Sequence, residues 1–160
     1  MEEEVEIAKQ VIRGLLDRMK VEAEVEGSIK EGNISIEITG DKEGILIGKH
    51  GRTLEALQIL INRMVNKQAK EHARVVLDVD HYLVRRADSL AKMAWRTGER
   101  VKREGKAITI GPFNARDRRI IHMALQEEPL LRTESSGEGE MKIITVTLKK
   151  KEGERIEPLE

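Results

Sequence analysis

Cysteine is absent from this sequence of 160 residues, which also contains only three prolines and one each of tryptophan, tyrosine and phenylalanine. Without cysteine there can be no disulfide framework and no thiolate metal site. Long apolar runs are missing too, which leaves no candidate membrane span. The start Met1-Glu2-Glu3-Glu4 is acidic, whereas a signal peptide starts with basic residues. We therefore expect a cytoplasmic protein that does not insert into a membrane.

The charge is balanced overall but distributed unevenly along the chain. The sequence has 29 basic and 29 acidic residues, yet residues 81–133 carry 12 basic and 6 acidic side chains, a net charge of +6. Residues 1–80 have a net charge of −4. A basic segment of this kind can attract a polyanion, although the charge alone favours the simpler explanation of a solvated helix face.

The apolar periodicity of the first 80 residues predicts a mixed α+β domain. Helical spacing over residues 5–19 is followed by two alternating segments, 21–27 and 34–38, on either side of a turn at 31–33. A short helix from Asp41, a long amphipathic helix from Arg52 and a third strand over residues 73–79 complete the pattern. The predicted order is α-β-β-α-α-β.

Residues 81–105 read as one long helix with an apolar side and a basic side. The apolar side carries Leu83, Ala87, Leu90, Ala94 and Val101, and the opposite side carries Arg85, Lys92, Arg96, Arg100 and Arg103. We place Trp95 between these sides, partly in the core rather than as a platform for base stacking.

After this helix we expect a strand over 107–110, a turn over 111–114, a helix over 115–126 with Asn114 as its N-cap, and strands over 130–135 and 142–149. The predicted domains are therefore 1–80 and 81–149, both small and of the α+β class. We expect residues 150–160 to be a polar C-terminal tail.

The segment GILIGKHGRTLEAL, residues 44–57, places a glycine-rich turn directly before a predicted helix. A P-loop needs four residues between its glycines and a hydroxyl after its lysine, whereas this segment has three residues and His50. We interpret Gly48-Lys49-His50-Gly51 as a Gly-x-x-Gly clamp for a sugar-phosphate backbone. Lys49 and Arg52 supply positive charge, and the start of the helix is expected to point its N–H groups at the phosphates.

A second candidate site lies in the predicted helix 115–126. Arg118 and His122 are four residues apart and share a face, where a guanidinium and an imidazole can both donate to a phosphate. Arg116 and Arg119 add flanking positive charge. An isolated Arg-x-x-x-His is more often an ordinary exposed pair, so the surrounding pattern decides the interpretation.

The Gly-x-x-Gly turn in an α-β-β-α-α-β order resembles the type II KH domain. Arg-x-x-x-His in a basic helix, after a short strand and a Pro-x-Asn turn, resembles the small nucleic-acid-binding domain named after that motif, the Arg-x-x-x-His domain. A KH domain followed by an Arg-x-x-x-His domain resembles the bacterial proteins known as Jag, and the resemblance covers residues 1–149. The stretches that carry the resemblance are Ile47–Gln58, Leu77–Asp80 with Tyr82 and Arg85-Arg86, and Asn114–Leu125.

The resemblance implies a bacterial RNA-binding protein, a post-transcriptional regulator or RNA chaperone, linked in some relatives to cell elongation or division and able to pair with a small KH-only protein. Many relatives carry a further N-terminal domain that this sequence does not include, so we do not expect functions that depend on it. Because the predicted strands lack aromatic rings, we expect single-stranded RNA to be held by the backbone clamp and basic side chains, over a groove floored by Ile36 and Ile47.

Alternatives to RNA binding remain. The Arg-x-x-x-His half could dock a protein, which would make the chain a scaffold, or the chain could prefer single-stranded DNA. Catalysis is not expected, since the serines lack a nucleophile-elbow setting and the histidines lack metal-ligand spacing. These histidines are His50, His72, His81 and His122. We expect no metal and no cofactor, and a nucleotide hydrolase is only a distant third alternative.

Overall fold

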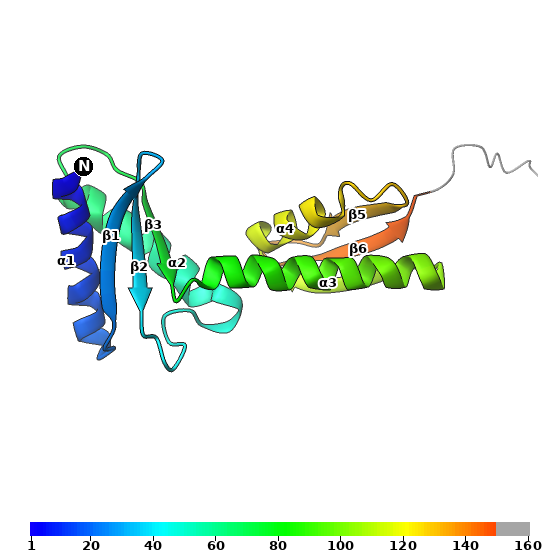
Figure 1. Cartoon of the computed structure of the whole chain (residues 1–160), viewed down its shortest axis with the longest axis horizontal. Helices are drawn as coiled ribbons and strands as arrows, with labels where there is room; N and C mark the ends of the chain where they lie inside the picture. Colours follow the sequence, from blue (N-terminus) through cyan, green and yellow to red (C-terminus); the bar gives the residue numbers. More distant parts are fainter. Residues whose placement is uncertain (150–160) are drawn as a thin grey trace, which may run out of the picture. The chain divides into compact units, whose positions relative to one another are not determined.

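The computed structural model describes residues 1–149. The chain forms two compact units, Met1–Arg85 and a second that begins at Arg86. Figure 1 shows that each unit combines helices with a small sheet, and the predicted α+β class is confirmed. No helix within residues 1–149 combines the length and the apolar character that crossing a membrane requires.

The first unit packs two helices against one face of a three-stranded sheet (Figure 1). Its elements are α1 (Glu2–Met19), β1 (Glu24–Lys30), β2 (Asn33–Thr39), the single 3-10 turn η1 (Lys49–Gly51), α2 (Arg52–Gln68) and β3 (Val75–Val79). The sheet order is β1-β2-β3, with β1 antiparallel and β3 parallel to β2. Helix α1 packs on β1 and α2, and α2 packs on β3. The alternating isoleucines of β2 point into this core and are almost fully buried.

Two predictions for the first unit are wrong in detail. Strand β1 begins at Glu24, three residues later than the alternation from Val21 suggested. The short helix expected from Asp41 does not form, and residues 41–47 make turns instead. The reason lies in the side chain of Asp41, whose carboxylate accepts the backbone N–H groups of residues 45–47 that would otherwise bond within a helix.

Amide side chains from α2 cover the outer edge of β3. Gln58 donates to the carbonyl of Val75 at 2.6 Å and accepts from the N–H of Leu77 at 2.8 Å. Asn62 forms hydrogen bonds with both the N–H and the carbonyl of Val75, and Asn66 does the same with residue 73. The spacing of four residues between these amides fixes α2 along the strand, and with it the glycine turn at the start of α2.

The second unit places α3 and α4 against an antiparallel sheet. Its elements are α3 (Tyr82–Glu104), which begins in the first unit, β4 (Ile108–Phe113), α4 (Ala115–Leu125), β5 (Leu131–Ser136) and β6 (Lys142–Leu148). The sheet order is β4-β6-β5. The core residues include Leu90, Ala94, Ile121, Leu125 and Ile144.

The periodicity of α3 and the cap of α4 are confirmed. Leu90, Ala94 and Val101 are buried, and the basic residues expected on the opposite side are exposed. The Asn114 side chain accepts the N–H of Asp117 at 2.8 Å. The turn expected over 111–114 is wrong, because β4 continues to Phe113 through an irregularity in its pairing with β6.

Candidate nucleic-acid interface

The glycine turn adopts a backbone shape that needs both of its glycines. Gly48 has φ 69° and ψ −176°, and Gly51 has φ 81° and ψ 11°. A Cβ atom at Gly48 would overlap the side chain of Thr53, and one at Gly51 would lie 2.6 Å from Cε1 of Tyr82. His50 is also left-handed, with φ 55°, a backbone conformation that few residues other than glycine adopt and in which asparagine, aspartate and histidine are enriched.

The first N–H groups of α2 do not point outward as expected, because the turn itself uses them. Arg52 donates to the carbonyl of Lys49, and residues 53 and 54 both donate to the carbonyl of Ile47 at 3.1 and 3.2 Å. Within residues 1–149, the backbone N–H groups of Lys49 and His50 donate to no other protein group. The side chains of Lys49, His50 and Arg52 are exposed. The donors that the turn offers to a ligand are therefore two backbone amides and its cations.

Two buried or half-buried carboxylates hold the loop that leads into the turn. Asp41 accepts from Ile45 and Leu46 at 2.9 Å and from Ile47 at 3.2 Å. Asp80 in turn accepts from the N–H groups of residues 40 and 41 at 2.9 and 3.1 Å. Sequence reasoning missed Asp41; its signal was an aspartate in the turn-forming segment that precedes the apolar residues 45–47 and the glycine turn.

One side chain predicted to floor the groove is not accessible. Ile36 is 1% exposed and faces the core beneath the helices, so the expectation that bases contact it is wrong. Ile47 is half-buried next to the turn, and Ile45 is exposed. The apolar surface beside the turn is therefore made by the loop before Gly48.

Arg118 and His122 are each engaged by hydrogen bonds within the second unit, Arg118 at the end of β4 and the loop before β6, and His122 on β5. Arg118 donates through Nη1 to the carbonyls of Phe113 and Glu140 at 2.7 and 2.8 Å. The ring nitrogens of His122 lie 2.6 Å from Thr133 Oγ1 and 2.7 Å from Ser135 Oγ. Burial, followed by the charge of Arg118, lowers the pKa of His122.

The two flanking arginines remain exposed. Arg116 and Arg119 make no side-chain hydrogen bond or ion pair within the described chain. The residue that follows Arg116, Asp117, is buried and receives the Nε and Nη2 groups of Arg86 at 3.2 and 2.8 Å. This ion pair joins α3 to α4, and sequence reasoning did not identify it.

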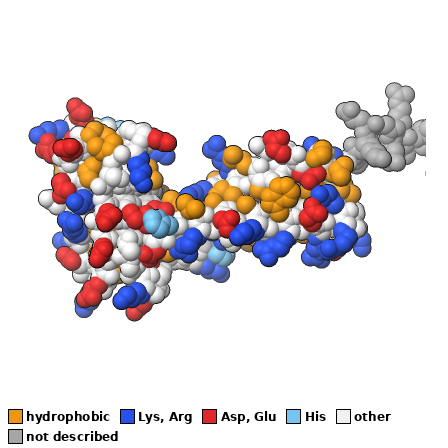
Figure 2. All heavy atoms as spheres, viewed as in Figure 1, with side chains coloured by type: hydrophobic (Ala, Val, Ile, Leu, Met, Phe, Trp, Pro, Cys, Tyr) orange, Lys and Arg blue, Asp and Glu red, His pale blue; other side chains and the backbone are white. Residues whose placement is uncertain are grey.

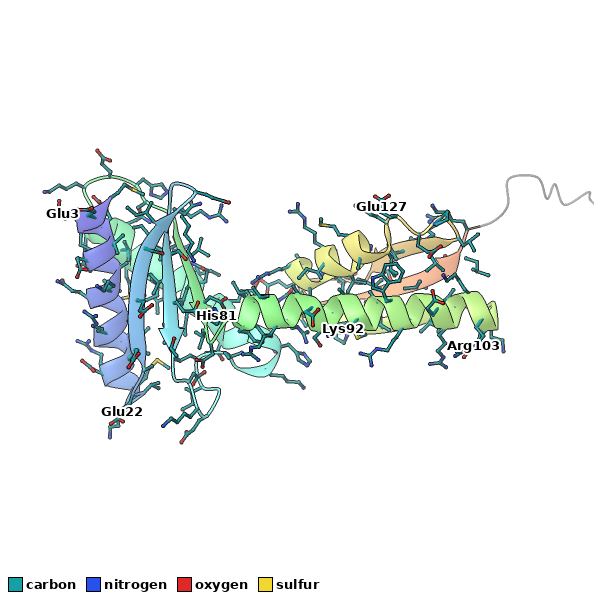
Figure 3. The ribbon with its side chains drawn as sticks, viewed as in Figure 1. Glu3, Glu22, His81, Lys92, Arg103 and Glu127 are labelled. Atoms are coloured by element: carbon teal, nitrogen blue, oxygen red, sulfur yellow. The ribbon has the colours of Figure 1, made fainter. Side chains whose placement is uncertain are left out.

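The exposed side of α3 carries basic residues along its length. Figure 2 shows Lys and Arg side chains along the edge formed by this helix, and Figure 3 labels Lys92 and Arg103 on it. Trp95 is 50% exposed and does not belong to the core, so the expected partial burial in the core is wrong. Among residues 1–149, no three His, Asp or Glu side chains gather as a metal site would require.

Comparison with known proteins assigns both halves of the chain. The family model described as "KhpA/KhpB, KH domain" matches residues 5–78, and the model of the domain named after the Arg-x-x-x-His motif matches residues 88–148. The chain belongs to the KhpB/Jag-like family. The glycine turn thus lies in the KH domain, and Arg118 and His122 lie in the Arg-x-x-x-His domain.

Several curated relatives carry the name "RNA-binding protein KhpB". That of Clostridium symbiosum is 36% identical over 146 residues, which are 91% of this chain and 65% of the relative. That of Lactiplantibacillus plantarum is 38% identical over 109 residues, 68% of this chain and 34% of the relative. That of Bacillus subtilis is 27% identical over 148 residues, 91% of this chain and 71% of the relative. The chain therefore spans less than two thirds of the first two relatives.

Proposed function

We propose that this chain binds single-stranded RNA and acts by binding rather than by catalysis. The family and the name of its relatives support RNA as the ligand. Without a double helix to read, a KH-type clamp recognises splayed bases and the backbone of a single strand. We also propose that the two domains, residues 1–80 and 81–149, act as separate modules on the strand.

The observation that carries the proposal is the geometry of the turn from Gly48 to Gly51. Neither glycine has a side chain to keep a sugar-phosphate backbone away. The N–H groups of Lys49 and His50 can donate to phosphate oxygens, while Lys49 and Arg52 add the charge. The Asp41 carboxylate holds the preceding loop in place, so the donors are arranged before the ligand arrives.

For the Arg-x-x-x-His domain, we propose that Arg118 and His122 bind a phosphate or nucleotide. Only Nη1 of Arg118 is used by the two carbonyls, which leaves Nε and Nη2 to donate. The contact between His122 Nε2 and Ser135 Oγ is exposed. Arg116 and Arg119 would contribute the flanking charge.

A second candidate for the Arg-x-x-x-His domain is a surface that docks a protein, which would make the chain a scaffold. The internal bonds of Arg118 and His122 favour this alternative, because both residues already stabilise the packing of α4 on β5 and on residues 113 and 140. The two candidates differ in whether the exposed arginines affect RNA affinity.

At the level of the cell, we propose a cytoplasmic post-transcriptional regulator or RNA chaperone. A small KH-only protein is a proposed partner, as the resemblance to the family implies. Copurification of this chain with such a protein, followed by size measurement, would test the pairing.

The test is binding of fluorescent single-stranded RNA and matched DNA across a salt series. The first variant is Lys49→Asp with His50→Asp; aspartate tolerates the left-handed backbone at position 50, so the fold should persist. Its matched control is Lys30→Asp with His72→Asp, which changes the same charges at exposed positions away from the turn. A third variant, Arg116→Ala with Arg119→Ala, removes charge from the Arg-x-x-x-His domain without touching the internal bonds of α4.

We expect the first variant to weaken RNA binding about ten-fold or more, since a hydrogen bond to a charged group is worth about 1.5–3 kcal/mol. The control variant should lose much less RNA affinity. Weaker RNA binding by the third variant would support nucleotide binding by the Arg-x-x-x-His domain, and unchanged RNA binding would support the docking alternative. Tighter binding of DNA than of RNA would replace RNA with single-stranded DNA as the ligand. Failure of the intact chain to bind either strand would contradict the proposal.

A further inference from the structure

Trp95 is the aromatic residue of this chain whose ring is left open to solvent. Phe113 is buried in the core of the second unit, and Tyr82 packs against Gly51 in the first. Trp95 keeps half of its surface exposed on α3. A large exposed indole is unusual in a chain so poor in aromatics, because burial of such a ring is strongly favourable.

The neighbours of Trp95 on α3 explain why its ring stays uncovered. Residues three and four positions away lie next to it on the helix surface, and two of these are Ala91 and Gly98. Gly98 is buried so closely that a Cβ atom there would lie 2.7 Å from Leu131 Cδ1. Since helical side chains lean toward the N-terminus, the indole is expected to point toward the turn that contains Ala91 and Lys92. Neither a methyl group nor a glycine can cover the face of an indole.

By its position on the helix, Trp95 lies between the buried apolar side of α3 and its exposed basic side. Figure 2 shows apolar side chains gathered between α3 and α4, next to the Lys and Arg side chains of α3. Exposed apolar residues of the second unit include Met123 on α4 and Leu130 in the loop after it. Lys92 extends from α3 (Figure 3) and pairs with Asp88 at 2.8 Å. Both partners of that pair are largely exposed, so the pair contributes little and Lys92 can exchange it for a phosphate.

We propose that Trp95 is a stacking site for an unpaired nucleobase, with Lys92 contacting the adjoining phosphate. The inference rests on the proposed function and adds to it a contact of the Arg-x-x-x-His domain that does not involve Arg118 or His122. An aromatic face beside cations is how proteins hold single strands with little sequence preference, because every base presents a π face. A protein ligand would suit the apolar side alone, whereas the basic side and the net charge of +6 over residues 81–133 favour a nucleic acid.

The experiment uses Trp95 as its own reporter, because it is the single tryptophan of the chain. Unlabelled single-stranded RNA is titrated into the full chain while indole fluorescence is recorded. Anisotropy of the same strand carrying a dye measures overall binding in parallel. An abasic strand of equal length supplies phosphates without bases. The variants are Trp95→Ala, Trp95→Phe and, as the matched apolar control, Met123→Ala, each checked for folding by circular dichroism.

We expect RNA to quench or shift the indole fluorescence and the abasic strand to do so much less. Trp95→Ala should weaken RNA binding about 5- to 150-fold, as alanine substitution does at stacking sites. Trp95→Phe should retain most of the affinity, and Met123→Ala should change it less than two-fold.

The inference and the proposed function fail in different ways. If anisotropy shows binding while the indole signal and the affinity of folded Trp95→Ala stay unchanged, stacking on Trp95 is wrong and RNA binding stands. Equal quenching by the abasic strand would also overturn stacking, since phosphate alone would then explain the signal. If the intact chain shows no anisotropy change with any strand, both the proposed function and the inference are overturned.

Discussion

Replacing Asp41 with alanine should destabilise the KH domain by about 2–4 kcal/mol. The carboxylate accepts three backbone N–H groups, at 2.9 Å from Ile45, 2.9 Å from Leu46 and 3.2 Å from Ile47. A hydrogen bond to a charged group contributes about 1.5–3 kcal/mol when its partner is left unsatisfied. Leu46 is fully buried, so its N–H cannot reach water, whereas Ile45 is exposed and its N–H can be hydrated. The variant therefore loses the full free energy of the hydrogen bond to Leu46 and part of the free energy of the other two hydrogen bonds.

Asp41→Asn should fall between the wild type and alanine. The single amide oxygen can replace Oδ2, which serves Leu46 and Ile47, but its NH₂ group then faces the N–H of Ile45. We expect this variant to lose about 1–2 kcal/mol, because one of the three bonds is replaced by two opposed donors.

Urea unfolding measures these losses in the intact chain. Far-UV circular dichroism follows both domains, whereas the fluorescence of Trp95 follows the Arg-x-x-x-His domain alone. The KH transition should move to lower urea in both Asp41 variants while the Trp95 transition stays in place. A change below about 0.5 kcal/mol in Asp41→Ala, the usual range of an ordinary surface substitution, would refute the role given to this carboxylate. So would equal losses in the alanine and asparagine variants.

Further predictions concern the turn and α4. Gly51→Ala should destabilise the KH domain by about 1–4 kcal/mol, because it adds a left-handed alanine and a clash with Tyr82; a thermal melt equal to wild type would contradict this. Asn114→Ala should cost about 1 kcal/mol in urea unfolding through loss of the α4 cap, and a loss under about 0.3 kcal/mol would show the cap to be dispensable. Burial and Arg118 lower the pKa of His122, so the unfolded chain binds the proton more readily and stability should fall as the pH drops below about 6.5. Arg118→Ala should raise the pKa of His122 in an NMR titration, and an unchanged or lower pKa would rule out repulsion between the charges of Arg118 and protonated His122.

Local pattern was enough to predict most elements and the position of the glycine turn. The spacing of Leu90, Ala94 and Val101 identified the buried side of α3, because an amphipathic helix has a fixed period. Asn114 was identified as a cap because its oxygen can reach the N–H three residues later. These features depend on neighbours within one or two turns of the chain.

The errors arose where a distant contact or a side-chain-to-backbone bond determined the structure. Asp41 replaced a predicted helix by turns, because its carboxylate competes for backbone N–H groups. Trp95 lies at the border of the buried side of α3, where the packing of neighbouring elements decides exposure. The internal bonds of Arg118 to Phe113 and Glu140 join residues up to 22 positions apart, which no local pattern reports.

The salt dependence of RNA affinity in Lys49→Asp with His50→Asp tests whether the turn from Gly48 to Gly51 binds the backbone of single-stranded RNA. Each phosphate contact of a single strand adds about 0.7 to the slope of log affinity against log salt. We expect this variant to have a slope smaller by about 0.7, the contribution of one contact, and an affinity lower by about ten-fold or more. The Lys30→Asp with His72→Asp control should stay close to wild type. A variant that is folded and matches that control in both slope and affinity would contradict the claim.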